Sequence, residues 1–253
     1  MSGEPAAGPR WEVLVVGSGD AFGTGGRLQA CLVLRSDAGM VLVDCGASSL
    51  PGLKRGGIDP GAIDAVIVTH LHGDHFGGLP FLVLDGQFAG RERPLVVAGP
   101  PGTRARLAIA TEALFPGSGA AHRRFTLEVV ELAPRVRTRV GPVAVTPVAV
   151  DHASGAPAYG LRIEAGDRLL AVSGDTAWTD SLIELADGAD VLVCEAYSYA
   201  KRIPYHLDYA TLAAHLGQLR CRQLVLTHLG PEMLAHVDQV AERCLHDGMV
   251  LEL

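Results

Sequence analysis

A short segment rich in histidine holds the side chains with the clearest chemistry. It offers three imidazoles and one carboxylate within six residues: His70, His72, Asp74 and His75. Neutral imidazole and carboxylate suit borderline-soft dications such as Zn²⁺. The apolar run Ala65–Val68 comes just before and helix signals follow, so we expect these ligands at the C-terminal end of a strand, where α/β proteins usually build sites. A surface loop that happens to be rich in histidine is the alternative.

Further potential ligands follow other strand-like runs. His152 comes after Val143–Val150, Asp175 after Leu169–Ser173, and His228 after Leu224–Leu226. Any one of these residues alone would be typical of a cap or a local hydrogen bond. Together with the first segment they predict a cluster of five histidines and two aspartates at the ends of several strands.

Composition and charge narrow the class of protein. Of the 253 residues, 48% are hydrophobic and 19% are charged, so we expect a sizeable core rather than general disorder. The net charge of −7 argues against a broad electrostatic footprint for nucleic acid, although metal ions could attract a small phosphate-bearing substrate. Five cysteines without a C-x-x-C pair favour free thiols in a reducing cytoplasm.

Residues 1–10 lack the features of a signal peptide and are predicted to form a loose, flexible tail. No apolar stretch approaches the length that a membrane span needs, so no membrane partner is expected. Strand and helix signals alternate over residues 11–253 without a linker, which predicts one α/β domain.

The expected strands are short apolar runs, several of them apolar at every position, as in strands that are covered on both faces. They are Val13–Val16, Cys31–Leu34, Val41–Val43, Ala65–Val68, Leu95–Val97, Val143–Val150, Tyr159–Ile163, Leu169–Ser173, Val191–Cys194 and Leu224–Leu226. Helices are expected from Pro80, from Thr103 as a cap, and after Asp180 and Asp208. The helix after Asp208 is expected to reach Leu219.

One short sequence pattern occurs twice. Ala65–His70 and Leu224–His228 both read as a buried strand, then threonine, then histidine. Two halves of similar build would produce this pattern, and coincidence is the alternative.

The ordered motifs resemble the metallo-β-lactamase superfamily, from about Trp11 to Leu253. The matching motifs are Thr69–His75, His152, Ser173–Thr176 and Leu226–His228. The resemblance implies a four-layer αββα sandwich with the site at one edge between the two sheets. It also implies two divalent metal ions, with Zn²⁺ favoured and Mn²⁺ or Fe as alternatives.

The resemblance assigns each ligand in turn. It implies that the first ion is bound by His70, His72 and His152, the second by Asp74, His75 and His228, and that Asp175 bridges both. Asp44 matches an aspartate that orients the ligand loop. Two such ions lower the pKa of a shared water toward neutrality and so supply a hydroxide nucleophile.

A narrower resemblance concerns the ribonuclease Z and cyclic phosphodiesterase-like branch. Val193–Ala196 followed by His206 is similar to its Glu and His motifs, and Gly17–Arg27 resembles its glycine-rich opening. The resemblance implies that Asp74, Glu195 and His206 act in catalysis, with His206 backed by Glu195 assisting the leaving oxygen. The alternative is that Glu195 caps a turn and His206 is a surface residue.

The spacing of the motifs bears on the substrate. Ribonuclease Z grips tRNA with a Gly/Pro-rich arm that the family inserts between the third histidine motif and the aspartate motif. Here only 22 residues separate His152 from Asp175, and two predicted strands occupy them. We therefore expect a small-molecule phosphodiester and disfavour extended nucleic acid.

The alternatives are hydrolysis of a carboxylic or sulfate ester, a lactone or a β-lactam, then tRNA 3′-processing, and last a non-catalytic, metal-stabilised binding module. A homodimer is a further expectation, because relatives often pair.

Several tyrosines and arginines allow both a functional and a structural interpretation. Four tyrosines around Glu195 and His206 could line a substrate rim or pack in the core: Tyr197, Tyr199, Tyr205 and Tyr209. Arg27, among glycines, is a candidate for contact with a substrate phosphate. Three arginines alternate with period two and are predicted to share one face of a solvated strand rather than clamp phosphate: Arg135, Arg137 and Arg139.

Overall fold

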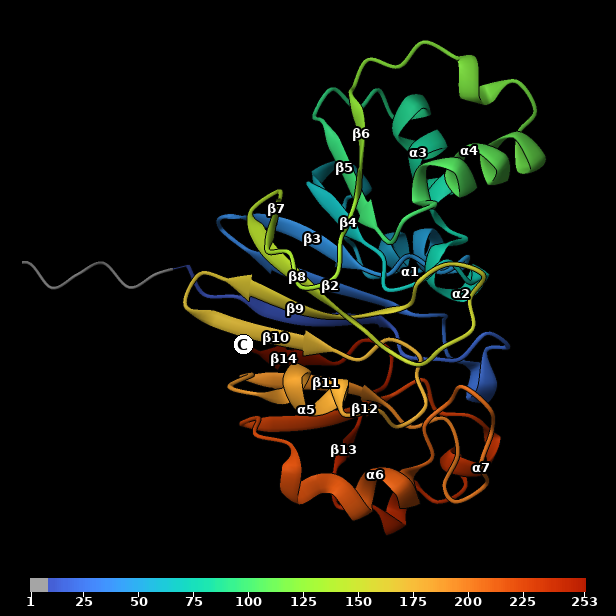
Figure 1. The fold of residues 1–253 in the computed structure, drawn as a ribbon. Helices are drawn as coiled ribbons and strands as arrows, with labels where there is room; N and C mark the ends of the chain where they lie inside the picture. Colours follow the sequence, from blue (N-terminus) through green and yellow to red (C-terminus); the bar gives the residue numbers. More distant parts are fainter. Residues whose placement is uncertain (1–8) are drawn as a thin grey trace, which may run out of the picture.

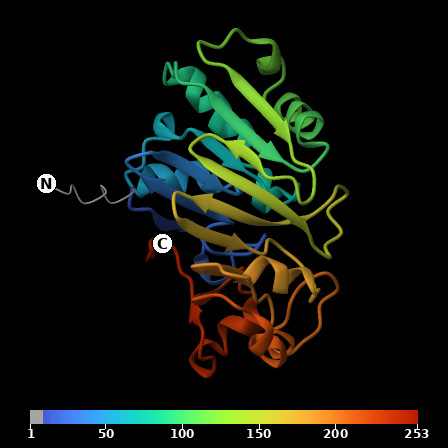
Figure 2. The ribbon, with the colours of Figure 1, turned by 60° about the vertical axis from the view of Figure 1, so that its left-hand side comes forward.

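The apolar runs form two seven-stranded mixed sheets in the computed structural model, which describes residues 9–253. The first eight residues of the predicted tail therefore lie outside the described residues. The two sheets pack face to face and helices cover both outer faces, as Figures 1 and 2 show. This is the predicted four-layer αββα sandwich.

The first sheet has the strand order β14-β1-β2-β3-β4-β5-β6. Its strands are β1 (Glu12–Gly17), β2 (Cys31–Ser36), β3 (Gly39–Val43), β4 (Ala65–Ile67), β5 (Leu95–Gly99), β6 (Leu127–Glu131) and β14 (Val250–Glu252). The second sheet has the order β13-β12-β11-β10-β9-β8-β7. Its strands are β7 (Thr138–Val140), β8 (Val143–Ala149), β9 (Tyr159–Ala165), β10 (Arg168–Val172), β11 (Val191–Glu195), β12 (Gln223–Thr227) and β13 (Arg243–Cys244). Every predicted strand is present, whereas β6, β7, β13 and β14 were not predicted.

The two sheets share one plan. In the first sheet, the pairings from β14 to β3 are antiparallel and those from β3 to β6 are parallel. In the second sheet, the pairings from β7 to β10 are antiparallel and those from β10 to β13 are parallel. Two halves of similar build are therefore present. However, β4 is fifth from the antiparallel end of its sheet and β12 is sixth, so the repeated strand-Thr-His pattern does not mark equivalent strands.

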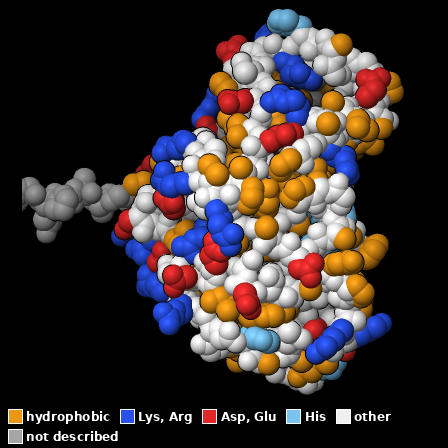
Figure 3. Space-filling view, in the orientation of Figure 1, with side chains coloured by type: hydrophobic (Ala, Val, Ile, Leu, Met, Phe, Trp, Pro, Cys, Tyr) orange, Lys and Arg blue, Asp and Glu red, His pale blue; other side chains and the backbone are white. Residues whose placement is uncertain are grey.

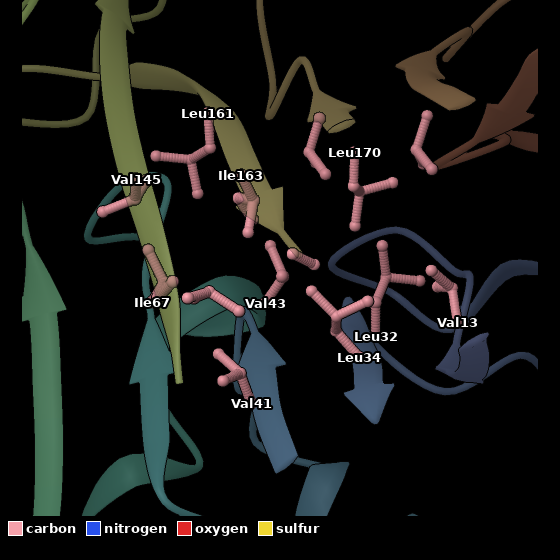
Figure 4. Packing of buried hydrophobic residues seen from close by; sticks show 14 of the residues in the cluster. Val13, Leu32, Leu34, Val41, Val43, Ile67, Val145, Leu161, Ile163 and Leu170 are labelled. Carbon is pink, nitrogen blue, oxygen red and sulfur yellow. The ribbon is translucent and has the colours of Figure 1, made fainter. Parts of the chain in front are cut away.

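The main core lies between the sheets (Figure 4). There, branched side chains of the first sheet, such as Val43 and Ile67, face Val145, Leu161 and Ile163 of the second. All five side chains are at most 1% exposed. Full burial of one such side chain stabilises the fold by about 1.5–3 kcal/mol, so this layer fixes how the two sheets meet at the site edge.

Two outer cores join the helices to the sheets. The helices on the first sheet are α1 (Ser49–Arg55), α2 (Gly73–Phe76), α3 (Leu79–Phe88) and α4 (Thr103–Leu114), with the 3₁₀ turns η1 (Thr24–Gly26), η2 (Pro60–Ala62) and η3 (Ser118–Ala120) in the same half of the chain. Those on the second sheet are α5 (Ser181–Ala186), α6 (Tyr209–His215) and α7 (Pro231–Leu234), with η4 (Leu216–Gln218) and η5 (Val237–Gln239). Leu53, Leu82 and Leu107 anchor the first set, and Leu185 and Leu212 anchor the second.

Of the three predicted helix caps, one is confirmed and two make no capping hydrogen bond. Asp208 caps α6 as expected, because its carboxylate accepts from the Thr211 N–H over 2.8 Å. Asp180 precedes α5 without a capping hydrogen bond. Thr103 is the first residue of α4 rather than its cap, since its hydroxyl donates to the Pro100 carbonyl. The helix after Asp208 ends at His215 and continues only as η4.

The arginine pattern was interpreted wrongly in one respect. Arg135 has a φ of 59° and only Arg139 lies in β7, so the three arginines do not share a strand face. Their solvated character is confirmed, because Arg135 and Arg137 form exposed ion pairs with Glu184 and Glu164.

The described residues also bear on the thiols and on membrane insertion. All five cysteines are free, and those in or next to β2, β3 and β11 are buried: Cys31, Cys45 and Cys194. Within residues 9–253, no helix has the length and apolar character that crossing a membrane requires.

Candidate metal centre

The ends of five elements bring the predicted ligands together at the right-hand edge of Figure 1. His70 comes shortly after β4, and His228 directly follows β12. His152 and Asp175 each come three residues after the end of β8 and β10. Asp74 and His75 lie in α2, with His72 at its N-cap. The site is therefore built beyond the C-terminal ends of strands of both sheets, as the sequence predicts.

All seven predicted ligands fall into two compact groups. The first contains His70, His72 and His152, and the second contains Asp74, His75, Asp175 and His228. Within each group the potential ligand atoms lie within 4.8 Å of one another. These are the same two groups that the resemblance implies.

Asp175 lies between the groups. Its Oδ1 is 3.2 Å from His75 Nε2, and its Oδ2 is 3.4 Å from His228 Nε2. The same Oδ2 is 3.8 Å from His70 Nε2 and 4.0 Å from His152 Nε2. One buried carboxylate thus faces histidines of both groups, which is the arrangement that a bridging ligand needs.

The hydrogen bonds of the histidines leave ring nitrogens free that a bound cation would satisfy. His152 Nδ1 donates to the Tyr205 carbonyl over 2.8 Å, so the Nε2 atom of the neutral ring carries no proton. That Nε2 faces His72 Nδ1 at 3.1 Å. Three further ligand atoms are buried without any hydrogen-bond partner: His70 Nε2, His75 Nε2 and Asp175 Oδ1. Since buried polar atoms are normally paired, these residues fit divalent cations.

Asp44 supports the ligand loop from behind, as the resemblance implies. Its Oδ2 accepts from His75 Nδ1 over 2.7 Å, and its Oδ1 accepts from the Thr69 N–H over 2.8 Å. The bond fixes the tautomer of His75 with the free lone pair on Nε2, toward Asp74 and Asp175. Thr69, whose hydroxyl also donates to Asp44, holds the start of the loop in place.

The charges in the cluster shift the pKa values of its members strongly. Burial lowers the pKa of His70, and the nearby His75 lowers it further. Burial also disfavours charged His75, but the carboxylates of Asp175 and Asp44 outweigh it and hold its pKa well above the usual range. Burial raises the pKa of Asp175, yet the charges of His228 and His75 outweigh that effect and hold the pKa well below its usual range. Such a cluster keeps its carboxylates ionised, as metal binding requires, and an ion would displace the extra proton that the carboxylates favour on His75 Nε2.

Glu195 and His206 form a pair beside the ligands. Glu195, the last residue of β11, is fully buried and accepts from His206 Nδ1 over 2.5 Å. Its other oxygen accepts from the Thr176 N–H over 2.7 Å. The His206 side chain is 23% exposed, and its Nδ1 is 3.9 Å from Asp175 Oδ2. The structure therefore brings the pair to the cluster and does not leave His206 as an isolated surface residue.

The pair has unusual proton affinities. Burial and the charge of Asp175 raise the pKa of Glu195, and the hydrogen bond from His206 only partly offsets them. Burial lowers the pKa of His206, but the hydrogen bond and charge of Glu195 outweigh it, so the pKa is raised. Because Glu195 occupies Nδ1, the proton on Nε2 of His206 is the one free to move.

The four tyrosines divide between the two interpretations. Tyr199 stacks on Tyr209 with ring centres 5.8 Å apart, and the Tyr209 hydroxyl donates to Glu242 over 2.7 Å. Those two rings pack against the outer core of the second sheet. Tyr197 instead lies 4.9 Å from the His206 ring, and Tyr205 is 48% exposed.

Two features of the site were not found in the sequence. The Tyr205 carbonyl orients His152, and a main-chain acceptor has no residue-type signal. Arg27 donates to the Leu245 carbonyl and to Ser18 Oγ, so its observed partners are parts of the protein rather than a ligand.

Comparison with known proteins agrees with this geometry. The family model described as the beta-lactamase superfamily domain matches residues 40–229. Ribonuclease Z of Anoxybacillus flavithermus is 28% identical over 290 aligned positions, which cover 91% of each chain. Ribonuclease Z of Mycobacterium bovis is 30% identical and covers 87% of this chain and 86% of its own.

Solved structures give the same fold. A metallo-beta-lactamase fold protein from Bacillus subtilis superposes with a TM-score of 0.79 at 21% identity, covering 97% of this chain and all of the other. The short form of human tRNase Z superposes with a TM-score of 0.77 at 25% identity, over 95% of this chain and 98% of the other. A diphosphatase from the PhnP family gives 0.76 at 21% identity, over 96% and 98%. The chain belongs to the beta-lactamase superfamily, has the metallo-β-lactamase fold and is a metal-dependent hydrolase.

Proposed function

We propose that this chain hydrolyses a small phosphodiester with two divalent metal ions, Zn²⁺ being the favoured ion. His70, His72 and His152 would bind one ion, and Asp74, His75 and His228 the other, with Asp175 between them. When bound, two such ions supply a hydroxide at neutral pH and stabilise charge on the attacked phosphorus group. The unpaired lone pairs of the buried ligand atoms support this assignment.

The single observation that carries the choice of reaction is the bond between His206 and Glu195. An alkoxide leaving group needs a proton, and a histidine beside the ligand cluster can donate one from Nε2. Glu195 accepts from Nδ1 and stabilises the charged imidazolium, the form in which Nε2 also carries a proton. Hydrolysis of a carboxylic or sulfate ester, a lactone or a β-lactam is the alternative, because the same ions serve a carbonyl group equally well.

The segment between His152 and Asp175 holds no inserted arm, which supports a small substrate. Between His152 and Asp175 the chain forms only the hairpin of β9 and β10, which lies within the sheet. The alignment with Anoxybacillus ribonuclease Z covers 290 positions, more than the 253 residues of this chain, so that enzyme has residues without a counterpart here. On the face shown in Figure 3, many Lys and Arg side chains gather on the left, away from the site edge.

Processing of tRNA is the second candidate, because the ribonuclease Z relatives match across most of both chains. A binding module without turnover is the least favoured, because ligands and proton donor stand together. The cytoplasmic location and the homodimer stay predictions from the sequence.

A pair of variants tests the proposal. Asp175→Ala is expected to lose metal, because it removes the carboxylate that faces both groups. His206→Ala is expected to keep near-normal metal content while turnover of bis(p-nitrophenyl) phosphate falls by about 10²–10⁴-fold, the usual contribution of a positioned proton donor. Metal content by elemental analysis and steady-state kinetics measure both effects.

Three results would count against the proposal. Equal turnover of His206→Ala and the wild type would remove the proton-donor role. Loss of metal in His206→Ala would instead make His206 a ligand, which its closeness to Asp175 and His228 allows. Faster hydrolysis of carboxylic esters than of 2′,3′- and 3′,5′-cyclic nucleotides and other phosphodiesters would favour the ester alternative, and cleavage of precursor tRNA would favour the second candidate.

A further inference from the structure

Two exposed aromatic side chains stand on loops whose main chain contacts the ligand cluster. Tyr205 is 48% exposed and Phe22 is 85% exposed. The Tyr205 carbonyl accepts from His152, a member of the first ligand group. Phe22 belongs to the glycine-rich loop (residues 17–27), whose Ser18 carbonyl accepts from the N–H of His228 in the second group. Both aromatic residues therefore belong to loops that touch the cluster, one at each ligand group.

The backbone of Tyr205 is in a conformation that its side chain does not favour. Its φ of 65° is left-handed, a region that bulky residues rarely adopt and that costs free energy. The N–H of the next residue, His206, donates to the Ile203 carbonyl over 3.1 Å and closes the tight turn. Glycine would present the same carbonyl to His152 without strain. The main-chain contact therefore does not explain why a tyrosine ring stands at this position.

Phe22 is held outward on a rigid support. The fully buried Asp20 carboxylate accepts from the Phe22 N–H over 3.1 Å and from the Thr24 N–H over 2.9 Å. On the other side, Gln29 Nε2 donates to the Ala21 carbonyl over 2.9 Å. The main chain is thus fixed on both sides of Phe22, and η1 packs against α7, as Figure 1 shows at the site edge.

Single exposed apolar residues are common on protein surfaces and need no function. Here, however, both rings stand on constrained loops, and the main chain of each loop contacts the ligand cluster through Tyr205 or Ser18. We infer that Tyr205 and Phe22 form an aromatic rim that stacks on a planar group of the substrate. The inference rests on the proposed function and deepens it: the substrate class is a phosphodiester that carries an aryl group or a nucleobase.

Two substrates with the same leaving group test the rim. In bis(p-nitrophenyl) phosphate the group that stays on phosphorus is planar, whereas in methyl p-nitrophenyl phosphate it is a methyl group. Tyr205→Asn removes the ring but tolerates the left-handed backbone, and Phe22→Ala removes the other ring. Each is expected to raise the ratio of the KM for the planar substrate to that for the methyl substrate by about tenfold, the scale of one stacking contact.

Matched variants separate the rim from general effects. Tyr205→Phe keeps the ring and is expected to restore the wild-type ratio. Phe88→Ala removes a ring that is exposed to 87%, as much as Phe22, but lies on α3, and it is expected to change neither KM. An unchanged ratio in both Tyr205→Asn and Phe22→Ala overturns the inference. Equal rises for both substrates overturn it as well, since Tyr205 would then act only through His152.

A binding measurement keeps the rim separate from the reaction. By calorimetry, the wild type is expected to bind p-nitrophenyl phosphate about tenfold more tightly than methyl phosphate, and Tyr205→Asn to lose this preference. If the wild type hydrolyses neither diester, the proposed function fails, and the rim is judged on this binding preference alone. Equal affinity of the wild type for both monophosphates overturns the rim.

Discussion

Replacing Asp44 by asparagine tests whether the residue behind the ligands controls metal binding. Asp44 has a φ of 60°, and asparagine adopts this left-handed conformation more readily than most residues, so the change removes charge without adding backbone strain. The asparagine oxygen can still accept from the Thr69 N–H, which is 2.8 Å from Oδ1. Its NH₂ group, however, would meet His75 Nδ1, which donates to Oδ2 over 2.7 Å in the wild type.

Two donors cannot face each other at that distance. His75 must therefore turn away or move its proton to Nε2, the atom that faces Asp74 and Asp175. Either response removes the lone pair that would bind the second ion. Loss of such supporting bonds typically weakens metal affinity by about 10–100-fold, which corresponds to about 1.4–2.7 kcal/mol.

The assay is a competition titration of metal-free protein with Zn²⁺ and a chromophoric chelator. We expect one site to weaken by that factor while the site of His70, His72 and His152 changes less. Asp190→Asn is the matched control: its carboxylate also binds Leu169 N–H, but it precedes β11 at the opposite end of the sheet. Wild-type affinity at both sites in a folded Asp44→Asn protein would refute the orienting role of Asp44.

Three further predictions concern the frame of the fold. Leu161→Ala removes a fully buried side chain between the sheets and should lower the free energy of unfolding by about 2–5 kcal/mol in urea titrations, whereas Arg137→Ala removes only an exposed ion pair and should leave the urea midpoint unchanged. A stable Leu161→Ala protein would contradict the central packing. Burial raises the pKa of Cys31 and Cys194 to about 12, so both thiols stay protonated at pH 8. They should react with a thiol reagent only after unfolding, and rapid labelling of the native protein, mapped by mass spectrometry, would contradict their burial.

The interior strands and the ligand order could be predicted because both depend on local residue types. A run such as Val191–Cys194 is short and apolar at every position, which is typical of a strand covered on both faces. The four strands that were missed are the four edge strands of the two sheets, and β6 with its sequence LEVVE mixes charged and apolar positions. Their pairing with strands far away in the chain, as of β14 with β1, leaves no local signal.

The tyrosines show the same limit within the site. Tyr197, Tyr199, Tyr205 and Tyr209 have the same chemistry and lie within thirteen residues. Two of them nevertheless pack on the outer core, one ring lies beside His206 and one is largely exposed. The position of Tyr205 depends on the turn that ends at His206. That turn is fixed by main-chain hydrogen bonds, which residue types do not reveal.

The conformations that the sequence could not predict are concentrated at the site. Within residues 9–253, the residues other than glycine with positive φ are Asp44, Arg135, Tyr205 and His228. Three of these four belong to the site: Asp44 and Tyr205 each orient a predicted ligand, and His228 is a predicted ligand itself. The left-handed conformation costs about 1–2 kcal/mol at each position. Aspartate and histidine adopt this region more often than tyrosine does, but no local sequence signal requires it at any of the three, so the surrounding packing must impose these conformations. Residues that break local rules in this way are expected where a site needs a fixed geometry. The strained backbone therefore lies at the same edge of the sandwich as the predicted ligands. Backbone angles and ligand residue types are independent observations, and both point to this edge.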